Sequence, residues 1–245
     1  MSSAAYIRYE LLRTFRNRRF FIFSFGFPLV LYFLIAGPNH NVKNLSGSGI
    51  SAPLYFMIGL TAFGTMNAML SSGARIAGER AAGWNRQLRL TPLSTLAYFR
   101  TKVVTGYLMA ATTMVLLFAA GSILGVRLSA TEWLETIGLL LVGLVPFAAI
   151  GILMGHLVTV DSVGPAMGGI TALLSLFGGV WFPISSGGAL YDIAQVLPSY
   201  WLVRAAHVAV GGHGWGTRGW IVVAIWTVVA ARLAGRAYRR DTTRN

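Results

Sequence analysis

The sequence has no cysteine, which excludes disulfides and thiolate metal sites. Charged residues make up only 11% of the 245 residues, against about 25% in soluble domains, whereas 55% are hydrophobic. Acidic residues are the scarcest, with seven Asp and Glu against twenty Lys and Arg. This composition indicates an integral membrane protein, because no polar segment is long enough to enclose a soluble core.

Long stretches without charge predict the membrane spans. Residues 44–74 and 103–126 contain no charged residue, and each can cross a hydrocarbon layer of ~30 Å as a helix. We predict an all-α integral membrane protein, a single transmembrane domain over residues 1–245 with six transmembrane helices. The first span is retained, because no small-residue cleavage site follows it. The spans cover about residues 20–37, 53–74, 101–126, 136–158, 162–180 and 215–236.

Basic residues cluster at span ends rather than on one soluble face, which argues against nucleic-acid binding. With six spans, the N-terminal segment, residues 75–102 and the C-terminal tail lie on one side and carry sixteen of the twenty Lys and Arg. The other side carries four. The positive-inside rule therefore predicts that both termini are cytoplasmic.

Two regions outside the spans have helical patterns of their own. Residues 3–19 form a basic amphipathic stretch in which Ile7, Leu11 and Phe15 share a stripe, as in helices that lie among lipid headgroups. Residues 181–212, between spans five and six, are apolar but broken by prolines. We expect two short re-entrant, extracellular helices there.

The loop at residues 75–100 is the longest polar, charged passage between two apolar ones. Trp84 and Leu88 stand four residues apart and share one face of a short helix. Thr91 and Pro92 are typical of an N-cap and the first position of the next helix. A short helix between two spans can pass motion from a soluble partner to the membrane-embedded part.

This loop resembles the E-R-x-x-G-x-x-x-Q-L-x-x-T-P-L-S stretch of ABC-2 type permeases, the membrane subunits of many bacterial ABC exporters. The resemblance extends to length, span count and charge layout. One departure is Arg86, where members of the family often have an acidic residue. The matching residues are Glu79, Arg80, Gly83, Gln87, Leu88, Thr91, Pro92, Leu93 and Ser94.

The resemblance implies a coupling helix that docks on a separate ATPase subunit, which binds ATP and Mg²⁺, so this chain needs no cofactor of its own. It also implies a second permease copy, expected as a homodimer, in a bacterial plasma membrane, and export of hydrophobic or amphipathic compounds such as a drug, antibiotic or lipid. Candidate substrate-path residues are Phe27, Phe63, Met66 and Phe177. The coupling residues are Glu79, Arg80, Gly83, Trp84, Arg86, Gln87, Leu88, Arg89, Leu90, Thr91 and Pro92.

The sequence offers little for catalysis. His156 and Asp161 are five residues apart and do not face each other on one helix, so a helix–helix hydrogen bond explains this histidine better than catalysis. The glycine-rich run at 211–216 lacks the lysine and hydroxyl of a phosphate loop. We therefore predict no catalytic and no metal-binding residues. The alternative function is a stand-alone channel or a lipid-metabolising membrane enzyme.

Two further patterns leave alternatives open. Glu79 either braces the docking helix through an arginine such as Arg75 or Arg80, or is an ordinary exposed glutamate. Glycine pairs four residues apart serve either packing within one bundle, which we favour, or contact with a second copy. These pairs are Gly121/Gly125, Gly151/Gly155 and Gly164/Gly168.

Overall fold

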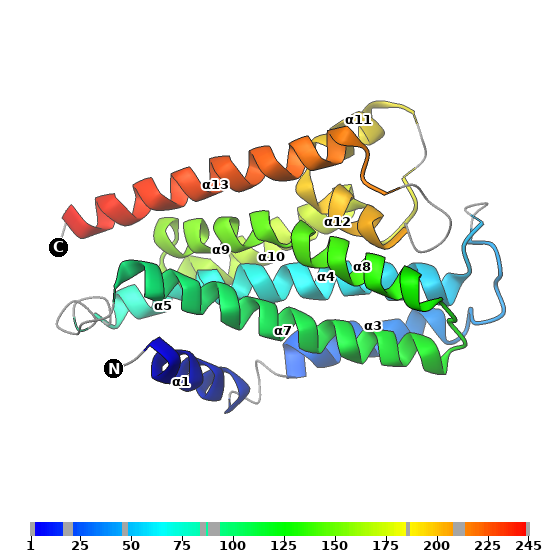
Figure 1. The fold of residues 1–245 in the computed structure, drawn as a ribbon, viewed down its shortest axis with the longest axis horizontal. Coiled ribbons are helices and arrows are strands. Elements are labelled where there is room, and N and C mark those ends of the chain that lie inside the picture. The colour runs from blue at the N-terminus through cyan, green and yellow to red at the C-terminus, as the bar shows by residue number, and fades with distance from the viewer. Residues whose placement is uncertain are drawn as a thin grey trace.

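The fold is all-helical throughout the part of the chain that the structure, a computed structural model, describes: residues 3–16, 22–45, 49–83, 87, 94–184, 187–207 and 214–243. The long helices form an elongated bundle (Figure 1). In chain order the elements are α1 (Ser3–Arg16), the π-helix η1 (Ile22–Gly26), α3 (Phe27–Ala36), α4 (Ala52–Ala74), α5 (Ile76–Ala81), α7 (Thr95–Ile123), α8 (Ala130–Gly143), α9 (Val145–Leu157), α10 (Val160–Gly178), α11 (Ala189–Val196), α12 (Pro198–His207) and α13 (Thr217–Thr243).

Five helical segments among the described residues are long and apolar enough to cross a membrane, and Ser24–Ala36 is apolar but shorter. This confirms the predicted all-α membrane class. The short segment occupies the place of the first of the six predicted spans. The five are Ala52–Ala81, Thr95–Ile123, Ala130–Leu157, Val160–Gly178 and Thr217–Asp241.

The predicted loop at 75–100 contains helix at both ends. After a turn at Arg75, the second span continues as α5 to Ala81, and α7 already begins at Thr95. Ser94 is the N-cap of α7, because its side chain accepts a hydrogen bond from the backbone N–H of Ala97 at 3.2 Å. The predicted cap at Thr91 and Pro92 lies outside the described residues.

The predicted fourth span consists of two helices. α8 starts with a capping box in which Ser129 and Glu132 each bind the other's backbone N–H. It ends at Gly143, and α9 follows after Leu144 with Pro146 in its first turn. Because proline has no N–H to donate, it fits the start of a helix better than its interior.

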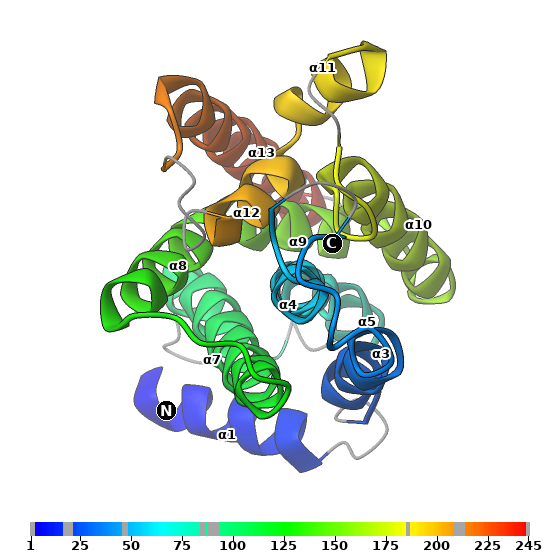
Figure 2. The same cartoon turned by 90° about the vertical axis from the view of Figure 1, so that its right-hand side faces the viewer.

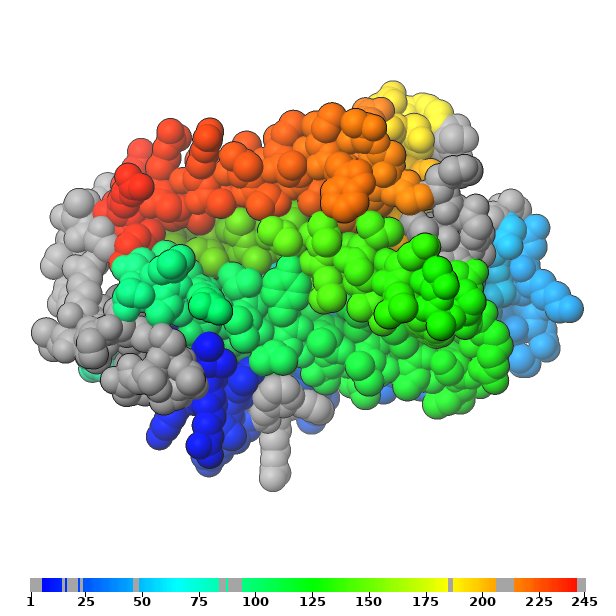
Figure 3. Space-filling model, viewed as in Figure 1, coloured from blue at the N-terminus to red at the C-terminus, as the bar shows by residue number. Residues whose placement is uncertain are grey.

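α4 lies at the centre of the bundle, with α3, α7, α9, α10 and α12 around it (Figure 2). Most of its side chains are buried. At Gly73 the backbone of α4 meets that of α9, since a Cβ atom there would lie 2.2 Å from the carbonyl carbon of Gly151. α13, in contrast, is exposed along most of its length (Figure 3).

The two short helices predicted between spans five and six are α11 and α12. Indole N–H groups fasten them to each other and to α13. Trp201 Nε1 donates to the carbonyl oxygen of Gln195 at 2.9 Å, and Trp226 Nε1 of α13 donates to that of Val196 at 2.8 Å. Both acceptors lie in the last turn of α11, where carbonyls have no partner within the helix.

Candidate functional site at the charged end

The ends of several helices meet at one end of the bundle, which we call the charged end: α1, α5, the start of α7 and the end of α13 (Figure 1). The N-terminal helix α1 and the C-terminal end of α13 both lie there. Residues 84–93, between α5 and α7, join two helices of this end in sequence. Apart from Gln87, these ten residues lie outside the described part.

Three buried charged side chains from three helices meet at the charged end. Lys102 of α7 is 1% exposed, and its Nζ lies 2.5 Å from Oε1 of Glu79 and 2.7 Å from Oε1 of Glu10. Glu79 comes from α5 and Glu10 from α1. One ammonium therefore joins α1, α5 and α7 through two charge-assisted hydrogen bonds.

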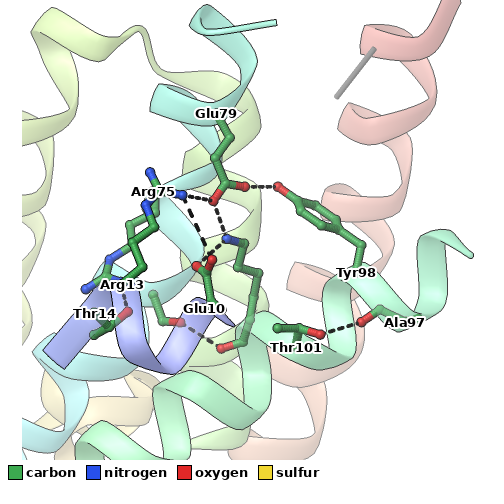
Figure 4. A network of polar contacts seen from close by, with 10 residues as sticks. Glu10, Arg13, Thr14, Arg75, Glu79, Ala97, Tyr98 and Thr101 are labelled. Carbon is green, nitrogen blue, oxygen red and sulfur yellow. Dashed lines mark hydrogen bonds and ion pairs between the residues drawn. The ribbon is translucent and has the colours of Figure 1, made fainter. Parts of the chain in front are cut away.

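Further polar side chains complete this network, which we call the Glu79 cluster (Figure 4). Tyr98 donates its hydroxyl hydrogen to Oε2 of Glu79 at 2.5 Å. The guanidinium of Arg13 lies 3.4 Å from Oε1 of Glu79, and that of Arg75 donates to the hydroxyl of Thr14. Buried carboxylates are tolerated only when they are paired in this way.

The cluster determines how α1 packs. Tyr6, Glu10 and Thr14 are buried, and stand at i, i+4 and i+8 on the face toward the bundle. Arg8, Tyr9, Leu12, Arg13 and Arg16 are exposed. The buried face lies beside the stripe of Ile7 and Leu11, which is partly exposed, and the ion pair with Lys102 holds Glu10 against the bundle.

We predict that Tyr98→Phe lowers the free energy of unfolding by about 1 kcal/mol, since it deletes one hydrogen bond to a buried carboxylate and keeps the ring. Thermal unfolding in detergent measures the change. Tyr107→Phe provides the control, because its hydroxyl donates to a neutral carbonyl, Leu141 O at 2.9 Å. An equal or larger loss at Tyr107 would contradict the special strength assigned to the Glu79 hydrogen bond.

Arg80 points to the other side of α5, toward α9 and α13. Its Nη1 donates to the carbonyl oxygens of Gly155 and His156, at 3.2 and 2.7 Å, which are orphan groups at the end of α9. Its Nη2 lies 3.0 Å from Oδ1 of Asp241 on α13. His156 Nδ1 is 2.7 Å from Oδ2 of the same aspartate. The interpretation of His156 as a helix–helix hydrogen-bonding group is confirmed.

The structure decides between the two interpretations of Glu79. The side chain is 2% exposed, so the exposed-glutamate alternative is wrong. Its partners are mainly Lys102 and Tyr98, whereas Arg80 pairs with Asp241 instead. The bracing therefore joins α5 to α1 and α7.

The remaining predicted coupling residues are only partly described. Gly83 ends α5 in a turn with φ +67°, which glycine adopts without strain, and Gln87 is exposed. A role of these residues in docking stays a prediction. Trp84, Arg86, Leu88, Arg89, Leu90, Thr91 and Pro92 lie outside the described residues.

Two of the four predicted substrate-path residues touch each other. The ring centroids of Phe27 and Phe63 are 6.2 Å apart, and those of Phe63 and Trp181 are 5.7 Å apart. Phe27 is 48% exposed and Phe177 is half-buried, whereas Met66 is packed in the core. Their role in transport stays a prediction.

Sequence reasoning placed the segments of Glu10, Tyr98, Lys102 and Asp241 on one side of the membrane but missed these four as site residues. One available signal was the scarcity of acidic residues. Three of the seven, Glu10, Glu79 and Asp241, fall in segments that the basic residues predict to share one side of the membrane. Each is the acidic residue in a strongly basic segment, which favours a specific ion pair.

The bundle of apolar helices with a charged end of this kind defines a multi-pass membrane protein, and the sequence comparison assigns its class. The ABC-2 type transporter family model matches residues 3–210, so the chain belongs to this family. The chain is thus a transport permease. It is 28% identical over 195 residues, 78% of each chain, to the "Putative transport permease YvfS" of Bacillus subtilis (strain 168).

Proposed function

We propose that this chain is the membrane-spanning subunit of an ATP-driven exporter, and that a separate ATPase subunit docks on residues 83–90. The observation that carries the proposal is the buried Glu79 cluster. α5 precedes the docking stretch and α7 follows it. The cluster fixes α5 both to α7 and to α1. A force applied to the stretch then acts on the bundle rather than on a loose loop.

The packing supports transmission of such a force. α5 continues from the central helix α4 after a turn at Arg75, and α4 contacts most of the other spans. Densely packed helices move as rigid elements between discrete arrangements. Closure of the ATPase subunits on ATP and Mg²⁺, which the partner binds, would therefore shift α4, α5 and α7 together.

We further propose that the charged end faces the cytoplasm of a bacterial cell. The count of sixteen against four basic residues supports this orientation. Both described ends of the chain lie at the charged end (Figure 1), as the proposed orientation requires. A homodimer, each copy with its own ATPase, completes the proposed exporter, and membrane lipids surround it.

The cargo we propose is a hydrophobic or amphipathic compound, such as a drug, antibiotic or lipid, so antibiotic resistance is one expected role. Its support is the apolar character of the spans. Phe27, Phe63 and Trp181 form an aromatic series with one partly exposed end. Aromatic faces of this kind bind apolar ligands.

The test of the proposed function is co-purification from native membranes in mild detergent. We expect the tagged chain to retain an ATPase, and Trp84→Asp together with Leu88→Asp to lower the bound ATPase by about tenfold or more, since each replaces an apolar side chain of the proposed docking stretch by a charge. Activity per permease measures the loss.

The control is Val42→Asp, which makes one such change from apolar to acidic at a partly exposed position in the turn between α3 and α4. It should leave ATPase binding unchanged. Retention of the ATPase by the Trp84 and Leu88 variant would refute docking at this stretch. Ion conduction or lipid turnover by the purified chain alone would favour the alternative function.

A further inference from the structure

The end of α13 is held by both helices that flank the docking stretch. On the entering side, Arg80 of α5 binds the Asp241 carboxylate with two nitrogens, Nη2 to Oδ1 and Nε to Oδ2, each at 3.0 Å. On the leaving side, the hydroxyls of Thr95 in α7 and Tyr238 lie 2.9 Å apart. Two-nitrogen binding of a carboxylate fixes both distance and orientation.

Aromatic rings strengthen the same contact. The ring of Phe99 in α7 lies 5.2 Å from that of Tyr238 and 6.0 Å from that of His156, in edge-on arrangements. His156 and Tyr238 are 5.7 Å apart. Such ring pairs favour defined geometry beyond simple burial. The last turns of α13 are therefore seated between α5, α7 and α9.

The other end of α13 reaches the two short helices. Arg218 Nη1 donates to Oε1 of Gln195 at 2.5 Å, and Trp226 Nε1 donates to the carbonyl oxygen of Val196 at 2.8 Å. The 25 residues from Thr217 to Asp241 span about 36 Å as a helix. α13 is thus one continuous element from the charged end to α11.

We propose that Asp241 and Tyr238 are positioning residues that make α13 a second output of the docking stretch, which carries its motion to α11 and α12 at the opposite end. The proposal rests on the proposed function. It differs from the role of the Glu79 cluster, which acts on α1 and α7. α13 also packs along α9, whereas one side of it is exposed (Figure 3), and Asp241 and Tyr238 add its contacts to α5 and α7 at the charged end.

The absence of cysteine from the chain allows a direct test. Ala189→Cys places a single fluorophore on α11, and Ser122→Cys places one on α7 at the same end; both positions are exposed. In the complex with its ATPase, in nanodiscs, the fluorescence change on vanadate trapping of nucleotide is measured for each reporter. Because the fluorescence change reports motion, a variant that folds normally can still lose it.

We expect Asp241→Asn to lower the Ala189 response by about twofold or more and to leave the Ser122 response unchanged, because only the route through α13 is broken. Asp241→Glu should restore it. Arg80→Gln should have the same effect on the Ala189 response, and the double variant should be no worse than either single one, since the two residues act as a pair.

The matched control is Arg236→Gln, a change of charge at an exposed position on the same helix. It should leave both responses intact. Tyr238→Phe removes the hydroxyl contact with Thr95 and keeps the ring. This variant still tests the inference if the Asp241→Asn chain does not assemble with its ATPase. An unchanged Ala189 response in both variants would overturn the inference. If neither reporter responds in the otherwise unaltered chain, the proposed function itself fails, and this inference with it.

Discussion

Replacement of Lys102 by methionine is expected to lower the free energy of unfolding by about 3–5 kcal/mol. Its ammonium is 1% exposed and lies within 2.7 Å of two carboxylates that are themselves at most 5% exposed. Methionine fills a similar volume but leaves Glu10 and Glu79 without their shared partner. The cost is that of uncompensated buried charge, which exceeds the value of the ion pair itself. Thermal unfolding in detergent, with expression level as a second readout, measures it.

Two further variants separate the cost of unpaired buried carboxylates from the effect of removing a lysine at any position. Lys43→Met removes an exposed lysine between α3 and α4 and should change stability by less than about 0.5 kcal/mol. The triple variant Glu10→Gln, Glu79→Gln, Lys102→Met should recover part of the loss, since it removes the two unpaired carboxylates, while the charges of Arg13 and Arg75 stay. A triple variant as unstable as Lys102→Met would show that the lysine acts through packing.

The spans could be predicted from the sequence because crossing a membrane is a local property. An uncharged run of sufficient length is enough, and α4, α7 and α10 lie close to their predicted positions. The limits of the polar loop were less predictable. Hydropathy assigned residues 75–81 to the loop because they contain charge, yet α5 is helical there, since Glu79 and Arg80 find partners on other helices.

Partners across the bundle could not be predicted, since they are set by helix rotation and packing. Lys102 stands 92 residues from Glu10, and Arg80 stands 161 residues from Asp241. In α1, the stripe of Ile7 and Leu11 was predicted to face lipid, but nothing in the sequence indicated that Glu10 is buried against the bundle. The scarce acidic residues indicated that specific ion pairs exist, but only the fold shows which Lys or Arg side chains they bind.

The glycine pairs show the same limit. All three pairs have the same spacing, yet Gly151 and Gly155 pack against the backbone of α4, with Cβ positions 2.6 Å from Leu70 O and 2.5 Å from Gly73 O. Gly121 faces Met57 of α4. Packing within one bundle is therefore confirmed for the pair Gly151/Gly155 and for Gly121, whereas Gly125 follows the end of α7 and has no described atom within 4 Å of a Cβ. Gly164 and Gly168 have nothing within 4 Å of a Cβ among the described atoms, a difference that spacing alone does not encode.

The crossing of α4 and α9 leads to the second large expected effect. Gly73→Ala should lower the free energy of unfolding by about 2–3 kcal/mol, as overpacking of a tight contact does. The new methyl group would lie 2.2 Å from the carbonyl carbon of Gly151 and 2.3 Å from the backbone nitrogen of Ile152. Backbone atoms cannot rotate away, so the two helices must separate. The higher helix propensity of alanine relative to glycine offsets only about 1 kcal/mol of this loss.

Gly168→Ala in α10 is the matched control, because the same methyl group meets no described atom within 4 Å. Only the helix preference then acts, and stability should stay equal or rise by up to about 1 kcal/mol. Thermal unfolding of both variants in one detergent compares the two effects, which have opposite signs. If Gly73→Ala proved as stable as Gly168→Ala, α4 and α9 could not be in backbone contact. The rigid connection from α5 through α4 to the rest of the bundle would then lose its physical basis.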